Sequence, residues 1–332
     1  MPSGITLTRH ILEQEQRYPK YAGQLSILLN QVAFGGKILA REISRAALIG
    51  KLGLVGERNA TGDAQKKLDI FGNEIMVSAF ADTGFVASIV SEELGEIEAV
   101  PGAENADYLV CMDPLDGSSN TDINGSIGTI FGILPRRKNL PAADPQQYYR
   151  TGAEQVVAGY IMYSTSTVLV YSIGHGVYGF TLDRDLGEFL LSHENIRCPR
   201  HGKIYSANVS HYDEWDTRIR YFVDDLTRPK AGKGAYSLRY TGALVADFHR
   251  CLLEGGLYFY PPDPGHKNGK LRLLYECSPL GFIAEQAGGA ASSGEMRILD
   301  IQADAIHQRV PLAIGSVEDV ALYDSFVREG RA

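Results

Sequence analysis

The strongest constraint on the fold comes from one short segment, Cys111-Met-Asp-Pro-Leu-Asp-Gly-Ser-Ser-Asn120. It includes the end of an apolar run that is typical of a buried strand, whereas Pro114 and Gly117 exclude a helix directly after it. We therefore expect Asp113 and Asp116 on a tight turn at the carboxyl end of that strand, where open α/β sheets bind their ligands. The turn also has a purely structural explanation, because Asp side chains bond their own backbone and glycine adopts positive φ.

Two further apolar runs also end in acids. Residues 85–90 (F-V-A-S-I-V) precede Glu92 and Glu93, and residues 271–275 (L-R-L-L-Y) read as a strand that runs into Glu276. Carboxylates gathered in one place raise one another's pKa unless a cation compensates for their charge. The candidate ligands are all oxygens, with no Cys or His pair at zinc spacing, so the pattern favours Mg²⁺ or Mn²⁺ and suggests phosphoryl transfer.

Composition narrows the class of protein. With 332 residues and a hydrophobic fraction of 44%, the chain can bury one large core or two closely packed ones. A net charge of −8 and a pI near 5.5 argue against a nucleic-acid partner. No stretch approaches the ~20 apolar residues of a membrane span, and we find no apolar signal core. Four cysteines without a close pair indicate buried thiols, so we expect a cytoplasmic protein.

Hydrophobic periodicity predicts helices over residues 24–49 and 67–81 and then a large mixed sheet between residues 85 and 191. Beyond a boundary near residues 192–201, helices and strands are expected to alternate. The predicted helices of this part cover residues 213–227, 242–253 and 278–287, and the predicted strands cover residues 203–207 and 257–260. The pattern indicates an α/β protein with an N-terminal domain over residues 1–195 and a C-terminal domain over residues 196–332.

Several motifs, in their order and spacing, make the chain similar to the class I fructose-1,6-bisphosphatases over nearly its whole length. They are Thr61-Gly-Asp63, Lys66-Lys-Leu-Asp69, Ser91-Glu-Glu93, Asp113-Pro-Leu-Asp-Gly-Ser-Ser119, Ser126-Ile-Gly-Thr-Ile-Phe-Gly132, Arg239-Tyr240, Gly269-Lys-Leu-Arg-Leu-Leu-Tyr-Glu-Cys277 and Asp304-Ala-Ile-His-Gln-Arg309. The resemblance implies a layered α-β-α-β-α sugar-phosphatase fold with mixed sheets. It also implies a homotetramer that hydrolyses the 1-phosphate of D-fructose 1,6-bisphosphate to fructose 6-phosphate and inorganic phosphate, in gluconeogenesis or the reductive pentose cycle.

The same resemblance assigns roles to the acids. It implies two or more Mg²⁺ ions per subunit, with Mn²⁺ as a possible substitute, and Asp69 and Glu93 as the carboxylates that activate water. The residues placed around the metals are Asp63, Glu92, Asp113, Asp116, Glu276 and, through its carbonyl, Leu115. Without the resemblance, Asp69 beside Lys66 and Lys67 also fits a solvated helix residue.

Substrate contacts are expected at both ends of the sugar. The phosphate that leaves is expected on Gly117, Ser118 and Ser119, next to Asp116, because a turn with exposed N–H groups and hydroxyls can cradle it. Similarity to the family implies that Arg239 reaches into a neighbouring subunit, and Lys270 and Arg272 are expected on one face of the strand that carries Glu276. The residues expected around the distal phosphate are Asn208, Arg239, Tyr240, Tyr258, Tyr260 and Lys270, with His211 or Tyr212 near Asn208, and Arg272 is a further expected substrate contact.

The chain departs from the family pattern in two places. His211, followed by Tyr212, replaces a tyrosine near the distal phosphate, and either side chain offers a hydrogen-bond donor. The AMP-binding turn of the animal enzymes reads Tyr21-Ala-Gly-Gln24 here, and Asp107 stands in place of a lysine. Because an anionic Asp107 repels a nucleotide phosphate, we expect weak or absent inhibition by AMP.

Other functions fit the sequence less well. A sedoheptulose-1,7-bisphosphatase or a dual-specificity bisphosphatase is the main alternative, because a sugar one carbon longer demands only a modest change of the pocket. An inositol or nucleotide phosphatase would not require the cationic distal pocket. A non-catalytic sugar-phosphate sensor is a remote alternative, since it would lack at least one of the metal or base carboxylates and all of them are present.

Overall fold

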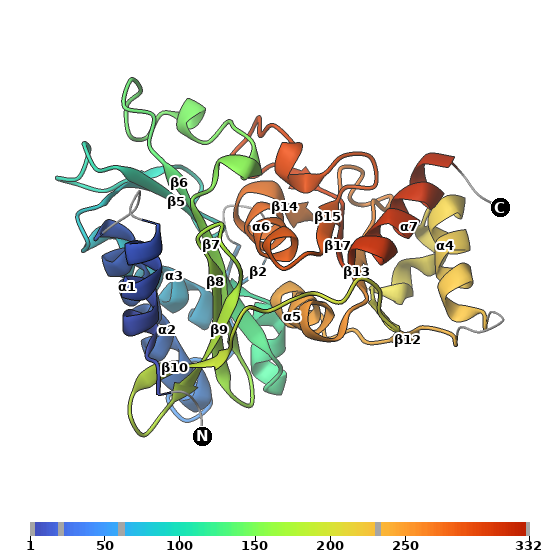
Figure 1. Ribbon diagram of the computed structural model, residues 1–332, viewed down its shortest axis with the longest axis horizontal. Coiled ribbons are helices and arrows are strands. Elements are labelled where there is room, and N and C mark those ends of the chain that lie inside the picture. Colours follow the sequence, from blue (N-terminus) through green and yellow to red (C-terminus); the bar gives the residue numbers. More distant parts are fainter. Residues whose placement is uncertain (1–3, 19–22, 59–63, 230–233, 330–332) are drawn as a thin grey trace.

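The computed structural model describes residues 4–18, 23–58, 64–229 and 234–329. Helices and sheets alternate across the molecule in five layers, α-β-α-β-α (Figure 1). The described α-helices are α1 (Leu7–Arg17), α2 (Gln24–Arg45), α3 (Lys67–Ala81), α4 (Thr217–Thr227), α5 (Leu244–Glu254), α6 (Ser278–Gln286) and α7 (Val317–Glu329). The layered α/β fold with mixed sheets that the sequence predicted is confirmed. None of these helices is long and apolar enough to cross a membrane.

The larger sheet contains eight described strands in the order β10-β9-β8-β7-β6-β5-β3-β4. The strands are β3 (Val86–Ser91), β4 (Glu98–Ala99), β5 (Tyr108–Asp116), β6 (Ile127–Pro135), β7 (Val157–Tyr163), β8 (Thr167–Ser172), β9 (Tyr178–Asp183) and β10 (Glu188–His193). Only β3 and β5 pair in parallel; the other neighbours are antiparallel. Since parallel strands end at the same edge of a sheet, β3 and β5 deliver the residues that follow them to one place.

Helices α1, α2 and α3 cover the outer face of this sheet (Figure 1). Helix α2 ends at Arg45 rather than at the predicted Ile49. Gly36 of α2 packs closely against Ile161 of β7. A Cβ built on this glycine would lie only 2.4 Å from the Ile161 Cδ1 atom, so a larger residue would clash here. Helix α1 was not predicted; Thr6 caps it by accepting a hydrogen bond from the Arg9 backbone N–H.

The second half of the chain contains a five-stranded sheet in the order β12-β11-β13-β17-β15. Its strands are β11 (Ile204–Ser206), β12 (Ser237–Leu238), β13 (Leu257–Tyr260), β15 (Ala290–Ser292) and β17 (Leu312–Gly315). Helices α5 and α6 lie between the two sheets, and α4 and α7 cover the far face of the smaller sheet (Figure 1). Phe248 of α5 meets Tyr160 of the larger sheet edge to face, with ring centroids 5.9 Å apart, so the middle layer packs both halves together.

Residues 271–275 do not form the predicted strand. Only Leu271–Arg272 is extended, as β14, and it pairs with β16 (Arg309–Val310). Leu273–Cys277 then forms a π-helical turn that leads directly into α6. The prediction was wrong because every residue of this run is buried, and a short buried run has no periodicity that separates strand from helix.

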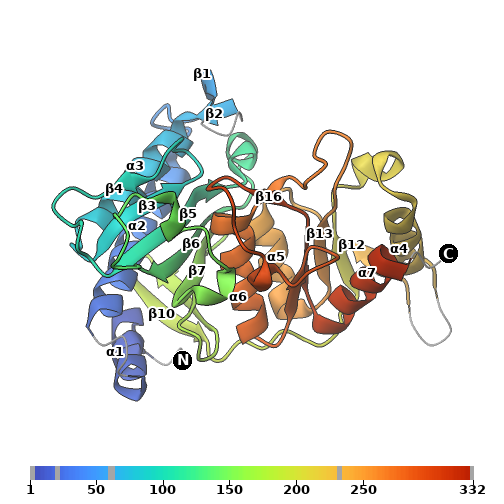
Figure 2. The same ribbon diagram turned by 90° about the horizontal axis from the view of Figure 1, so that it is seen from above.

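A separate two-stranded sheet, β1 (Leu54–Arg58) with β2 (Ala64–Lys66), leads into α3 and projects from one end of the molecule (Figure 2). The four cysteines of the sequence are all buried and free, as the absence of close pairs predicted.

Candidate active site

The acids at positions 113 and 116 lie within strand β5 rather than on a turn after it, so the predicted end of this strand was wrong. The pairing of β5 with β6 is Asp113 to Ile130 and Asp116 to Gly128, with a register shift between them. In a regular strand, residues three apart point to opposite faces. The extra residue in β5 is a bulge, and it allows both carboxylates to face the same site.

A buried cluster of carboxylates forms at this bulge. Carboxylate oxygens of Asp113, Asp116 and Glu276 all lie within 4.8 Å of one another. Burial raises the pKa of Asp113 well above its usual range, and the neighbouring charges of Glu92, Asp116 and Glu276 raise it further. Burial also raises the pKa of Asp116 to about 6 and that of Glu276 well above its ordinary value. A buried all-oxygen cluster with this repulsion fits a hard divalent cation.

Backbone N–H groups hold each of the three carboxylates. Asp113 Oδ1 accepts from the Leu115 N–H at 2.9 Å, and Glu276 Oε2 accepts from the N–H of Arg272. Asp116 accepts from the first two N–H groups of helix α5, Leu244 at 3.3 Å and Val245 at 2.7 Å. The positive end of the α5 dipole therefore faces Asp116 and helps to fix its position.

Glu92 directly follows strand β3 and lines the same cleft as the cluster. Ser91 pairs with Met112, so Glu92 follows β3 at the level where Asp113 continues β5. After burial, Glu92 is the largest cause that raises the pKa of both Asp113 and Glu276. Asp63, the remaining acid expected near the metals, lies outside the described residues.

Asp69 opens helix α3 and is buried, with 3% of its surface exposed, so the interpretation as a solvated helix residue is wrong. Its Oδ2 atom accepts a hydrogen bond from the Lys66 N–H at 2.8 Å, whereas Oδ1 has no hydrogen-bond partner in the described part of the chain. Burial raises the pKa of Asp69, and the Lys66 N–H and the Ser118 hydroxyl oppose that shift. A buried carboxylate with a raised pKa is suited to accept a proton.

The turn after Asp116 depends on glycine. Gly117 has φ of 75°, and a Cβ on it would lie 2.4 Å from the Ala243 Cβ atom. Ser118 then starts a 3-10 helix, Ser118–Ile123. The sequence interpretation missed Lys66 here: its Nζ donates to Asp122 at 2.8 Å and to the Ser119 carbonyl at 3.3 Å, which ties this turn to the start of α3.

These groups share one cleft of about 450 Å³ with part of the expected distal-phosphate pocket. Lys270 stands at that end of the cleft, with Nζ 5.5 Å from the centroid of the Tyr260 ring. Besides Lys66, the sequence interpretation did not single out Leu54, Gly242 and Leu244, which also line the cleft. The predicted residues that line it are Asp69, Glu92, Glu93, Asp113, Leu115, Asp116, Gly117, Ser118, Ser119, Tyr240, Tyr258, Tyr260, Lys270 and Glu276.

Three neighbouring residues of the predicted set stand outside this lining. The Asn208 side-chain oxygen accepts from Ser210 Oγ at 2.7 Å, and His211 Nδ1 lies 2.9 Å from a Glu214 carboxylate oxygen. The Tyr212 hydroxyl donates to Asp224 Oδ1 at 2.7 Å. These side chains thus bond to Ser210, Glu214 and the Asp224 side chain of α4 in this structure.

Two predicted arginines also stand outside the lining. Arg239 is exposed, and its Nη1 donates to the Leu238 carbonyl at 2.8 Å. Arg272 is buried, whereas Lys270 is exposed, so the two cations differ in their access to solvent. The reason is the short β14: Lys270 precedes it, and the chain turns into the π-helical turn directly after Arg272.

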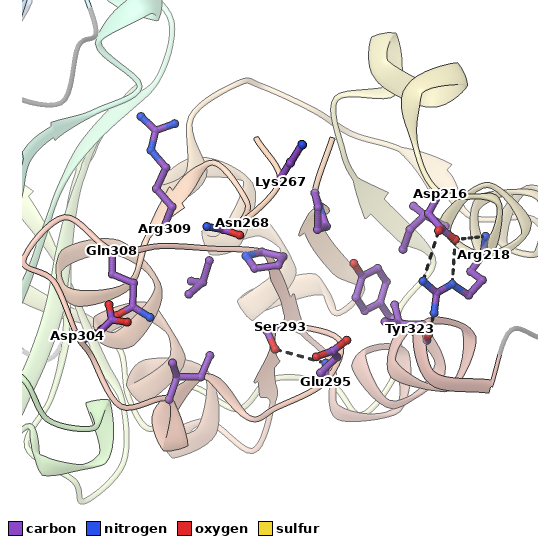
Figure 3. Close-up of a pocket in the computed structure, with 16 residues that line it drawn as sticks. Asp216, Arg218, Lys267, Asn268, Ser293, Glu295, Asp304, Gln308, Arg309 and Tyr323 are labelled. Carbon is purple, nitrogen blue, oxygen red and sulfur yellow. Dashed lines mark hydrogen bonds and ion pairs between the residues drawn. The ribbon is translucent and has the colours of Figure 1, made fainter. Parts of the chain in front are cut away.

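A larger cavity of about 710 Å³ lies elsewhere in the C-terminal half and contains none of the predicted site residues (Figure 3). Its lining mixes charges of both signs. Asp216 forms an ion pair with Arg218 at 2.9 Å, and Glu295 and Asp304 carry further negative charge. Because no single charge dominates this lining, the acid cluster and its cleft are the better candidate for phosphate chemistry.

Comparisons with known proteins identify the family of the chain. The family model described as "Fructose-1-6-bisphosphatase, N-terminal domain" matches residues 5–194, and the corresponding C-terminal model matches residues 198–328. The chain belongs to the class 1 fructose-1,6-bisphosphatase family. Within this family, a protein of Acaryochloris marina named fructose-1,6-bisphosphatase class 1 2 is 56% identical over 332 residues, which is 100% of both chains. A class 1 fructose-1,6-bisphosphatase of Chlorobium phaeovibrioides is 48% identical over 97% of each chain.

Solved structures of the fructose-1,6-bisphosphatase family share the fold. The Leishmania major enzyme in its holo form has a TM-score of 0.92 and 37% identity, with both chains covered completely. The apo form of the same enzyme gives a TM-score of 0.88 and 35% identity, again over 100% of both chains.

Proposed function

We propose that this chain is a Mg²⁺-dependent fructose-1,6-bisphosphatase that hydrolyses the 1-phosphate of D-fructose 1,6-bisphosphate to fructose 6-phosphate and inorganic phosphate. One observation carries the proposal: a buried acid cluster and a cationic, tyrosine-lined end share a single cleft. A bisphosphate needs both ends, because one phosphate reacts while the other is held at a distance. Membership of the family supports the same substrate.

The acids of the cluster are suited to hold the metal. Asp113, Asp116 and Glu276 supply buried oxygens within 4.8 Å of one another, and we propose Glu92, the Leu115 carbonyl and Asp63 as further ligands of two or more Mg²⁺ ions. When bound, divalent metal neutralises charge on the phosphoryl oxygens and acidifies water. The all-oxygen ligand set admits Mn²⁺ as well.

Asp69 is the proposed proton acceptor, with Glu93 beside it. During hydrolysis a water oxygen bonds to phosphorus while the bond between phosphorus and the sugar oxygen breaks. The attacking water gives its proton to the carboxylate of Asp69, and the sugar oxygen takes up a proton from solvent as it leaves. Gly117, Ser118 and Ser119 hold the phosphate in line with the attack.

For the distal phosphate, Lys270 is the proposed cation, and Tyr240, Tyr258 and Tyr260 are the proposed hydroxyl donors. We propose that Asn208 and either His211 or Tyr212 complete this pocket and that the exposed Arg239 serves a neighbouring subunit of a homotetramer. In this proposal residues 1–195 supply most of the metal-site acids, and residues 196–332 supply Glu276 and the distal pocket. Free, buried cysteines support a reducing, cytoplasmic location.

Phosphate release from fructose 1,6-bisphosphate, sedoheptulose 1,7-bisphosphate and inositol phosphates, with and without Mg²⁺, tests the proposal. We expect the fructose substrate to be hydrolysed only with a divalent cation, and Asp113→Asn to lower kcat by more than about 100-fold. Faster release from the sedoheptulose substrate would favour the alternative bisphosphatase. If phosphate is released from none of these substrates, the result would favour the alternative of a non-catalytic sugar-phosphate sensor.

A further inference from the structure

The motif at residues 304–309 contributes no side chain to the cleft, yet its histidine reaches the turn that carries Glu276. The Tyr275 hydroxyl and His307 Nδ1 are 2.9 Å apart, and the two rings meet edge to face with centroids 5.9 Å apart. Tyr275 is fully buried, lies in the π-helical turn and directly precedes Glu276. A contact to Tyr275 therefore acts on the backbone next to a proposed metal ligand.

The other side of the histidine ring faces the second acid-bearing segment. His307 Nε2 is buried and has no hydrogen bond of standard geometry within the described residues. Burial lowers the pKa of His307, and the backbone of Leu94 and Gly95 opposes this shift, so these residues lie close to the ring. Leu94 and Gly95 directly follow Glu92 and Glu93. The imidazole thus stands between the turn of Glu276 and the loop of Glu92.

The motif itself is anchored by main-chain bonds. Its backbone pairs with β14, Arg309 opposite Arg272, and the Leu273 N–H donates to the Gln308 carbonyl at 2.8 Å. Asp304, Gln308 and Arg309 line the larger cavity instead, as Figure 3 shows. His307 is therefore held on a fixed segment while its neighbours face another space.

Charges around Tyr275 link the same two acids. Burial raises the pKa of the Tyr275 hydroxyl, and the negative charges of Glu92 and then Glu276 raise it further, whereas the charge and side-chain hydrogen bond of Arg272 lower it. We infer that His307 and Tyr275 are positioning residues that set the separation between Glu92 and Glu276 and thereby the affinity for the divalent cation. The inference rests on the metal site of the proposed function. Metal ligands commonly depend on such supporting hydrogen bonds, and π-helical turns are frequent at functional sites.

Tyr275→Phe tests the inference, and the chain offers a matched control. Tyr171 is also fully buried, and its hydroxyl lies 2.8 Å from His10 Nδ1 with ring centroids 6.0 Å apart, but neither residue lines the cleft. We expect Tyr275→Phe to weaken Mn²⁺ binding, measured by calorimetric titration of the protein, by about 10-fold. The same substitution should raise the Mg²⁺ concentration for half-maximal activity by the same factor. The KM for the sugar should stay unchanged at saturating Mg²⁺. Tyr171→Phe should bind Mn²⁺ like the unaltered protein.

Two substitutions of His307 separate its contacts. Asparagine places an amide near the Nδ1 position and keeps a partner for Tyr275, whereas glutamine places it near the Nε2 position. We expect His307→Asn to retain more Mn²⁺ affinity than His307→Gln, with similar melting temperatures. Equal Mn²⁺ affinity in Tyr275→Phe, His307→Gln and Tyr171→Phe would overturn the inference.

Asp113→Asn distinguishes failure of the inference from failure of the site. If Asp113→Asn loses Mn²⁺ binding while the Tyr275 and His307 variants keep it, the metal site is correct and the positioning role is wrong. If Asp113→Asn binds Mn²⁺ normally, the proposed metal site is misplaced, and the positioning role is rejected with it.

Discussion

The carboxylate of Glu15 accepts a hydrogen bond from the backbone N–H of Ser26 at 3.0 Å, at the first turn of helix α2. The Gly23 N–H donates to the same oxygen, also at 3.0 Å. Helix N-termini attract anions, and this one is already occupied by a buried carboxylate of the chain itself. Nearby, Asp107 accepts from Gln24 Nε2 at 3.1 Å and from Lys138 Nζ at 2.7 Å.

These two carboxylates strengthen the prediction that AMP inhibits this enzyme weakly or not at all. A nucleotide phosphate at this turn would meet the charges of Glu15 and Asp107. We expect AMP at millimolar concentration to leave the initial rate unchanged, in the protein itself and in Asp107→Lys, because Glu15 still fills the helix end in that variant. Micromolar inhibition would contradict the prediction. Tyr21 and Ala22, which belong to the same sequence turn, lie outside the described residues.

Lys270 and Arg272 should behave differently when their charge is removed. Lys270 is exposed in the cleft, and a hydrogen bond to a charged group contributes about 1.5–3 kcal/mol, so Lys270→Met should raise KM about 10- to 100-fold without loss of stability. Arg272 is buried, and its charge lowers the pKa of Glu276, so Arg272→Met removes a compensating positive charge from a buried acid. Arg272→Met should therefore lower the melting temperature. Equal effects of both substitutions on KM would reject this distinction.

The hydrogen bonds of His211 and Tyr212 in this structure indicate which of the two residues is expected to contact the distal phosphate. The Tyr212 hydroxyl donates to Asp224, whereas the His211 ring contacts Glu214, on its own turn, through Nδ1. Of the two, we expect His211 to serve the distal phosphate. His211→Gln should raise KM several-fold, and Tyr212→Phe should leave KM unchanged while it lowers stability. The opposite order would assign the contact to Tyr212, and unchanged KM in both would remove the segment from the pocket.

The acid cluster predicts an unusual dependence of stability on pH. Folding raises the pKa of Asp116 from its ordinary value near ~4 to about 6 and raises those of Asp113 and Glu276 as well. The folded state then binds more protons than the unfolded state, so this contribution is complete below about pH 4 and is lost as pH rises through 6. Without divalent ions, the melting temperature of the protein should fall relative to Asp113→Asn as pH rises over this window.

Mg²⁺ should reverse that loss at neutral pH, because a bound cation replaces the protons. Thermal denaturation with Mg²⁺ and with chelator, at pH 5 and pH 7.5, measures both effects. A stabilisation by Mg²⁺ that is larger at pH 5 would have the wrong sign for this cluster.

The sequence predicts the parts of the site that depend on local signals. Apolar runs followed by acids located Glu92 and Asp113, and the Gly117 turn followed from its residue types. It could not show that a bulge keeps Asp116 within β5, or that Leu273–Cys277 forms a π-helical turn, because both depend on pairing with distant segments. The burial of Asp69 and Arg272 was not predicted for the same reason. A charged residue in a sequence pattern is expected at the surface, and only tertiary contacts bury these two side chains.

The hydrogen bonds from helix α5 to Asp116 have a consequence for movements of the two halves of the chain relative to each other. Asp116 belongs to the larger sheet, whereas Leu244 and Val245 belong to the other half of the chain, so the proposed ion site is built across a seam between the two halves. A hinge movement that opened this seam would pull the carboxylate from its donors and disperse the ligands. Ion affinity therefore reports how firmly the two halves are closed, and a crosslink across the seam should tighten it.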